Sequence, residues 1–151
     1  MATPYKVPVS VLVVIHTQDR QVLLLERADR PEFWQSVTGS QDPGETLLAT
    51  AQREVGEETG LDASRYGLLD WHKQNLYEIF ANWRHRYAPG VTHNVEHVFS
   101  LQLPQPLPVA LAAREHLHYV WLPWREAAGK VFSWSNAEAI RELPQRVGVD
   151  S

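Results

Sequence analysis

The chain has 151 residues, no cysteine and a formal net charge of −4. This length fits a single domain over residues 1–151, and the lack of cysteine excludes a disulfide framework, a thiolate zinc site and a cysteine nucleophile. The acidic balance argues against a nucleic-acid partner. A small anionic substrate remains compatible, because a bound divalent cation can reverse the local charge.

No segment approaches the roughly 20 consecutive apolar residues of a membrane-spanning helix. The longest N-terminal apolar run, Val9 to Ile15, is too short, and no basic leader precedes it. We therefore expect no membrane partner, a cytoplasmic location and, by default, a monomer.

The N-terminal part of the chain is typical of strands and loops. Apolar, β-branched runs predict strands at Val7–His16 and Gln21–Glu26, joined by a turn. A short extended piece at Trp34–Thr38 leads into Gly39, and residues 40–45 have the composition of a loop.

A helix is predicted over Thr46–Thr59, and Gly60 follows it as a C-terminal cap. Its apolar stripe consists of Leu47, Leu48, Ala51 and Val55. Further strands are predicted at Tyr66–Trp71, Asn75–Phe80, Asn94–Leu103 and His118–Leu122. A second helix is predicted over Ser135–Leu143, with Ser135 or Asn136 as its cap. Strands and helices in this mixed order predict an α/β layered fold with a mixed sheet.

Three carboxylates on the first helix carry the chemical signal. Glu54, Glu57 and Glu58 are spaced i, i+3 and i+4, so they share about 100° of the helix surface. Like charges on one face repel, and a hard divalent cation with oxygen ligands turns that repulsion into a binding site. A solvated acidic patch is the plain alternative, and the residues around the three acids decide against it.

Those residues complete a known pattern. Gly39, five residues, Glu45, seven residues and then the run from Arg53 to Leu61 resembles the complete 23-residue Nudix box over residues 39–61. The resemblance implies a Nudix-type α/β/α sandwich with a mixed sheet and a diphosphate-bond hydrolase. It also implies Mg²⁺, with Mn²⁺ as a possible substitute, on Glu54, Glu57 and Glu58. Glu45 and Arg53 would be structural partners, and Gly39, Gly44 and Gly60 would shape the loop and the helix end.

A further carboxylate from outside the box is expected at the metal. Glu115 stands just before a predicted strand and Glu96 within one, and we favour Glu115 because a residue at a strand mouth reaches an ion more easily. Glu54 or Glu115 would be the base that activates water. His116 and His118 lack a third nitrogen or sulfur ligand nearby, which favours structural or substrate-side roles.

Short runs outside the box resemble a branch of the family that removes pyrophosphate from a pterin triphosphate in folate synthesis. By that resemblance, Lys6 and Arg27 would meet phosphate and Thr38 would offer a hydroxyl. Ring stacking and an acceptor for ring N–H groups would come from Tyr77, Glu78, Ile79 and Phe80, and Trp34 and Ser133 would close the pocket. Core packing is the competing interpretation of each aromatic residue. The run Trp83–Tyr87 interleaves basic and aromatic side chains and is interpreted as a strand or loop beside the phosphates.

Two rivals stay open at this level. The first is a Nudix hydrolase of nucleoside triphosphates, oxidised nucleotides or dinucleoside polyphosphates. The second is a Nudix-shaped binding module without catalysis, which the full set of box carboxylates disfavours.

Overall fold

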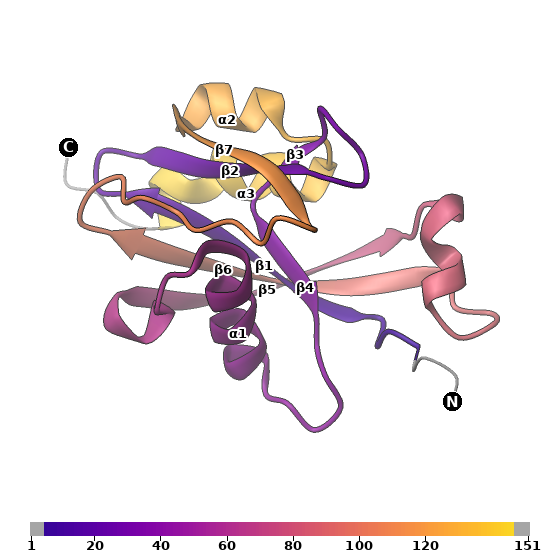
Figure 1. Cartoon of the computed structure of the whole chain (residues 1–151). Coiled ribbons are helices and arrows are strands. Elements are labelled where there is room, and N and C mark those ends of the chain that lie inside the picture. The colour runs from indigo at the N-terminus through magenta and orange to yellow at the C-terminus, as the bar shows by residue number, and fades with distance from the viewer. Residues whose placement is uncertain (1–4, 147–151) are drawn as a thin grey trace.

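One mixed sheet forms the middle of the molecule, and the computed structural model describes residues 5–146 (Figure 1). Its central strand, β1 (Val9–Thr17), runs parallel to β6 (His93–Leu103) and antiparallel to β4 (Val37–Ser40). The remaining strands pair antiparallel with β1, β2 or β6, and they are β2 (Gln21–Arg27), β3 (Trp34–Gln35), β5 (Gly67–Glu78) and β7 (His116–Pro123). The predicted mixed sheet is therefore confirmed.

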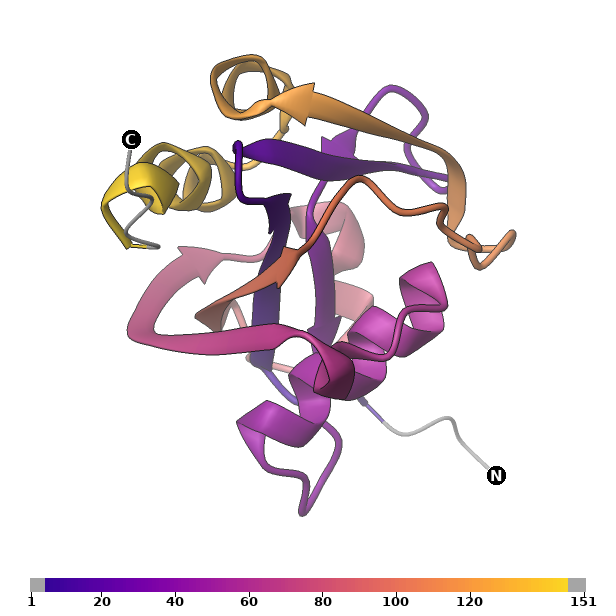
Figure 2. The ribbon, with the colours of Figure 1, turned by 90° about the vertical axis from the view of Figure 1, so that its left-hand side faces the viewer.

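Strand β1 is buried on both faces, which explains its continuous apolar sequence. Val11, Val13 and Ile15 pack into a core beneath α1 (Leu47–Thr59), whereas Leu12 and Val14 pack into a second core on the opposite face. Helices α2 (Trp124–Lys130) and α3 (Trp134–Arg146) cover that second face. Figure 2 shows α1 and α3 on opposite sides of β1, as the predicted α/β/α sandwich requires.

Helix α1 ends at the predicted residue and begins one residue later than predicted, at Leu47. The hydroxyl of Thr46 accepts a hydrogen bond from the Ala49 N–H at 3.1 Å, so this residue caps the helix. Gly60 has φ 74° and donates its N–H to the Gly56 carbonyl at 2.9 Å. The left-handed backbone conformation at this position favours glycine, so the helix ends here without strain.

The predicted strands Tyr66–Trp71 and Asn75–Phe80 are one strand in the structure, which corrects the sequence interpretation. Asp70 pairs with Phe99 and Gln74 with His97, so a bulge absorbs the extra residues between them. His72 lies in the bulge with φ 53°, and the Asp70 carboxylate accepts its N–H at 2.8 Å. The bulge bends β5 but leaves it paired with β6, because pairing resumes at Gln74 with a shifted register.

The C-terminal helices also differ from the prediction. Helix α2 was not predicted, since its seven residues are too few to show a clear period. Helix α3 begins at Trp134, and Ser133 Oγ accepts the Asn136 N–H at 3.2 Å, so Ser133 is the cap rather than Ser135 or Asn136. The Asn136 side chain instead accepts the Ser36 N–H at 2.8 Å and ties α3 to the sheet.

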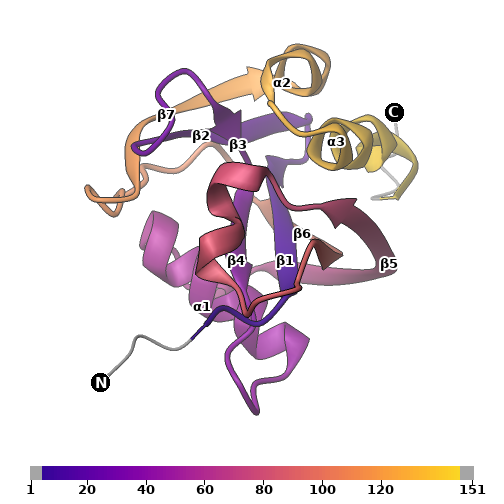
Figure 3. The same ribbon diagram turned by 90° about the vertical axis from the view of Figure 1, so that its right-hand side faces the viewer.

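Two short 3₁₀ helices complete the described chain, η1 (Ala63–Arg65) and η2 (Ala81–Arg86). Segment η2 connects β5 to β6 at one end of the sheet, where it lies in the foreground of Figure 3. Among residues 5–146, no helix is long and apolar enough to span a membrane.

Candidate active site

Helix α1 places two carboxylates at the boundary of the core. Glu54 and Glu58 lie one turn apart, and they are 9% and 2% exposed. Their neighbours Ala51 and Val55 are fully buried in the core beneath α1 and fix the rotation of the helix. Because the apolar stripe faces the sheet, both carboxylates are carried to the sheet's edge at β4 rather than to bulk solvent.

Gly39 on β4 makes room for Glu54. A Cβ at position 39 would lie 2.0 Å from the Glu54 carboxyl carbon and 2.2 and 2.4 Å from its two oxygens. Any side chain at this position would therefore displace the Glu54 carboxylate. Gly44 allows the tight turn Asp42–Glu45 before the helix, because its φ of 79° is a conformation that favours glycine.

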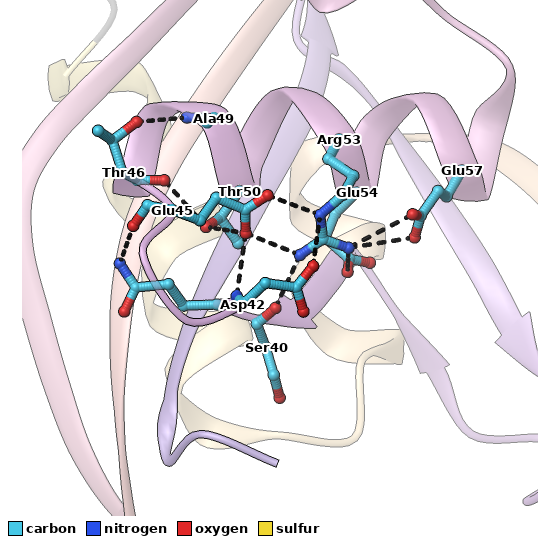
Figure 4. Close-up of polar contacts among 10 residues, drawn as sticks. Ser40, Asp42, Glu45, Thr46, Ala49, Thr50, Arg53, Glu54 and Glu57 are labelled. Carbon is cyan, nitrogen blue, oxygen red and sulfur yellow. Dashed lines mark hydrogen bonds and ion pairs between the residues drawn. The ribbon is translucent and has the colours of Figure 1, made fainter. Parts of the chain in front are cut away.

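Arg53 joins the loop to the helix through its guanidinium (Figure 4). Two of its nitrogens donate to the two oxygens of Glu45 at 2.8 and 3.0 Å, and one also donates to the Ser40 carbonyl at 2.9 Å. The third nitrogen donates to Glu54 Oε1 at 2.7 Å. Hydrogen bonds from Arg53 lower the pKa of Glu45 to about 2, so this pair stays ionised at neutral pH.

Burial dominates the electrostatics of Glu54 and Glu58. It raises the pKa of Glu54, and it raises the pKa of Glu58 well above its ordinary value. The hydrogen bond that protonated Glu58 donates to Glu54, together with the negative charge of Glu54, raises the pKa of Glu58 further. Glu58 Oε1 is buried and has no hydrogen-bond partner among the described residues. Two adjacent carboxylates with an unsatisfied oxygen suit a divalent cation, which would supply the missing partner and the missing charge.

Glu57 is oriented differently from the other two box carboxylates. Its side chain is 53% exposed and lies 3.3 Å from Arg53. Within residues 5–146, no three His, Asp or Glu side chains converge closely enough to coordinate one ion as they lie. The donor set fits a divalent cation through Glu54 and Glu58, and Glu57 must turn away from Arg53 to join them.

A cavity of ≈ 780 Å³ opens beside these carboxylates. Of the residues predicted for the site, it is lined by Lys6, Arg27, Thr38, Gly39, Arg53, Glu54, Glu58, Tyr77 and Glu115. Thr38 Oγ1 donates to the Val11 carbonyl at 2.9 Å, and the Tyr77 hydroxyl accepts from Asn94 at 3.1 Å. The carboxylates and the predicted phosphate-binding cations thus share one cavity.

Several predicted residues lie outside this lining, namely Glu57, Glu78, Ile79, Phe80, Trp34 and Ser133. Glu78 forms an ion pair with Arg84 at the surface, and Ile79 is 3% exposed in the interior. Phe80 stacks with Trp83 at 5.1 Å between ring centroids. Ser133 Oγ caps α3, and Trp34 packs into the core beneath α2 and α3, so the structure gives both of them contacts outside the cavity.

Of the two extra carboxylate candidates, the structure places Glu115 at the cavity and Glu96 behind it. Glu115 precedes β7, and its charge contributes to the raised pKa of Glu58. Glu96 is 4% exposed and does not line the cavity, and burial raises its pKa.

Trp83 and Arg86 line the cavity too, and both belong to the run that was interpreted from the sequence as lying beside the phosphates. Asp29 and His116 line it as well, and Asp29 was not assigned to it from the sequence. His116 Nε2 lies 3.5 Å from Glu58 Oε1, and burial together with the charge of Arg27 lowers the pKa of His116 to about 4. It is therefore neutral at physiological pH. No motif of the sequence singled out Asp29.

Comparison with known proteins decides the family. The NUDIX domain model matches residues 6–143. The chain belongs to the Nudix family. It is 50% identical to the dihydroneopterin triphosphate diphosphatase of Escherichia coli K12 over 142 residues, which cover 92% of this chain and 93% of that protein. The Haemophilus influenzae protein of the same name is 43% identical over 141 residues, 91% of this chain and 88% of that one.

The solved structures agree with this assignment. The E. coli dihydroneopterin triphosphate pyrophosphohydrolase superposes with a TM-score of 0.88 and 47% identity, covering 97% of this chain and 99% of that chain. Nudix hydrolases generally depend on a divalent metal, which accords with the buried carboxylate pair of α1.

Proposed function

We propose that this Nudix hydrolase converts dihydroneopterin triphosphate into dihydroneopterin monophosphate and pyrophosphate, a step of folate synthesis. The observation that carries the proposal is one cavity that brings the buried carboxylates Glu54 and Glu58 together with Lys6 and Arg27. Relatives at 43–50% identity over nearly the whole chain carry this activity in their names and support the choice of substrate.

In this proposal, Mg²⁺ (or Mn²⁺ as a substitute) is held by Glu54, Glu58 and Glu115, with Glu57 joining after it turns. When bound, it supplies neutralisation of charge on the phosphate oxygens and acidification of water. The chain's own side chains bind and orient the substrate. Lys6 and Arg27 bind the phosphates, and Tyr77 contacts the pterin end of the cavity.

Glu115 is the residue proposed to take the proton of the attacking water, with Glu54 as the alternative. The Glu115 carboxylate lines the cavity and forms no ion pair with another residue of the described chain. Glu54 instead accepts a hydrogen bond from Arg53 at 2.7 Å, which holds its carboxylate in a fixed place. Arg53 and Glu45 brace the loop that covers the site. This bracing matters for the reaction, because catalysis of phosphoryl transfer depends mainly on positioning and charge.

Steady-state kinetics on a substrate panel test the proposal. Dihydroneopterin triphosphate, dGTP, dATP, 8-oxo-dGTP and a dinucleoside tetraphosphate are compared with Mg²⁺, and pyrophosphate release is measured. We expect the highest kcat/KM for the pterin substrate. A purine nucleotide that exceeds it by a wide margin would overturn the substrate assignment and leave the family assignment intact.

Glu54→Gln and Glu58→Gln test whether the chain is an enzyme at all. Both variants should lose hydrolysis, whereas a surface variant, Glu126→Gln, should keep it. Parental rates in both box variants would contradict the metal-site argument and favour a binding module. The cytoplasmic location and the monomeric state remain predictions, which sedimentation and cell fractionation can address.

A further inference from the structure

The guanidinium groups of two arginines lie against the ring of Trp83 in η2. The Arg27 guanidinium carbon lies 4.5 Å from the centre of the Trp83 ring, and that of Arg86 lies 5.6 Å from it. Both distances are within the range of a cation–π interaction. One aromatic ring therefore holds an arginine from β2 and an arginine from η2 close together.

The carboxylate of Asp29 accepts hydrogen bonds from the same two arginines. It accepts two hydrogen bonds from Arg27, both at 2.7 Å, and one from Arg86 at 3.3 Å. These contacts lower the pKa of Asp29 to about 2, so the carboxylate stays ionised at neutral pH. Its charge offsets part of the repulsion between the two cations, which lets them stay paired before an anion arrives.

The pair is also tied to Lys6 and faces the acidic part of the cavity. The backbone N–H of Lys6 donates to the backbone carbonyl of Arg86 at 2.9 Å. Burial and the charges of Arg86 and Arg27 lower the pKa of Lys6, whereas Glu54 and Glu115 raise it, so Lys6 is near both groups. Lys6, Arg27, Arg86, Glu54 and Glu115 all line the one cavity.

We propose that Arg86 is a second phosphate-binding guanidinium that acts together with Arg27, and that Trp83 is a positioning residue that keeps the two side by side. The proposal rests on the proposed function, because it assigns the pair to the phosphate groups released as pyrophosphate.

Guanidinium chemistry favours phosphate as the ligand of this pair. Arg27 donates three of its five N–H groups to Asp29 and Gln35, and Arg86 donates one to Asp29. The remaining N–H groups of the two guanidiniums can donate to one tetrahedral anion, and phosphate accepts several such bonds. Asp29 already engages both groups through carboxylate oxygens, which demonstrates that they can share one anionic partner. A pterin ring carries no such negative charge, so it would bind the two guanidinium groups less strongly than phosphate does.

The first test measures the affinity for inorganic pyrophosphate by calorimetry in Mg²⁺ buffer. Arg86→Ala should raise the pyrophosphate Kd by about 10-fold to 100-fold, the range expected for losing one charged hydrogen-bonding group. The matched control is Arg125→Ala, because Arg125 also stacks on a tryptophan, at 4.9 Å from the Trp124 ring, but does not line the cavity. The control should stay within about twofold of the parent. Arg86→Lys should recover part of the affinity, since lysine keeps the charge but not the fork.

The second test separates positioning from folding at Trp83. Trp83→Leu should raise KM for the triphosphate substrate about tenfold while changing kcat less, because the guanidiniums lose their common support. Trp83→Phe keeps a flat ring and should restore KM to within about threefold of the parent. Melting temperatures are recorded for all variants. If Trp83→Leu changes the melting temperature but leaves KM and the pyrophosphate Kd at parental values, the positioning role is refuted.

The outcomes distinguish this inference from the proposed function. A parent that hydrolyses the pterin substrate while Arg86→Ala matches Arg125→Ala in pyrophosphate Kd would overturn the inference alone. A parent that binds pyrophosphate through Arg86 but leaves the pterin substrate intact would support the inference and overturn the proposed substrate. A parent with no measurable pyrophosphate affinity would overturn the inference.

Discussion

Gly39→Ala is expected to inactivate the protein while leaving it folded. The added Cβ would lie 2.0 Å from the Glu54 carboxyl carbon, and an ordinary contact begins at 3.4 Å, so that carbon must move by about 1.4 Å (3.4 − 2.0). A misplacement of about 1 Å at an active site can reduce the rate about 100-fold. The displaced group is the end of a flexible side chain, so we expect a stability loss of no more than about 1 kcal/mol, or about 2–4 °C in Tm.

The assay is kcat/KM for dihydroneopterin triphosphate with Mg²⁺, together with thermal unfolding. Gly129→Ala is the matched control, because a Cβ there meets no atom within 4 Å and the residue lies in α2 away from the cavity. The control should keep parental activity, and its helix position should make it slightly more stable. Activity of Gly39→Ala within about threefold of the parent would refute the idea that the place of the Glu54 carboxylate matters.

Three further predictions concern other parts of the site. Burial raises the pKa of Glu58 above its ordinary value of 4.5, so metal-free protein should lose stability as pH rises above that value. In Glu58→Gln this loss should be reduced, although hydrolysis falls about 1,000-fold, and unfolding in EDTA between pH 4 and 8 measures the difference. Arg53→Lys removes the two-pronged hydrogen bond to Glu45. It should lower the free energy of unfolding, measured in urea, by about 2 kcal/mol, and it should also lower kcat. An unchanged urea midpoint would contradict the bracing role. Ser133→Ala should cost about 1 kcal/mol through the lost cap with KM unchanged, whereas a raised KM would restore its predicted place at the substrate.

Local patterns explain why the first half of the fold was predictable. Strand β1 is a continuous apolar, β-branched run and helix α1 carries an apolar period, and Thr46 and Gly60 bound the helix with residues of the appropriate chemistry. The break predicted within β5 failed for a different reason. Polar residues around His72 are typical of a turn, but the bulge they form depends on the register with β6, which no local pattern contains.

The substrate pocket was predictable only in part because strands alternate their faces. Tyr77 lines the cavity, and its neighbour Glu78 points to the surface, where it pairs with Arg84. Successive side chains of a strand point to opposite faces, so Tyr77 and Glu78 cannot both face the cavity, and Ile79 and Phe80 lie beyond the end of β5. Trp83 and Arg86 reach the cavity from the segment after the strand, and the path of that segment depends on tertiary contacts with β2.

The box carboxylates show how far helix spacing alone can specify a metal site. Spacing predicted a shared face for Glu54, Glu57 and Glu58, but that face spans the boundary between core and solvent. Glu58 is 2% exposed with an unsatisfied oxygen, whereas the Glu57 side chain is 53% exposed and engaged by Arg53. Arg53 is itself held by both oxygens of Glu45, so it will stay in place when a cation arrives. In the proposed metal site, Glu57 is then the carboxylate that would have to exchange partners, and Glu54 and Glu58 would form the preformed pair.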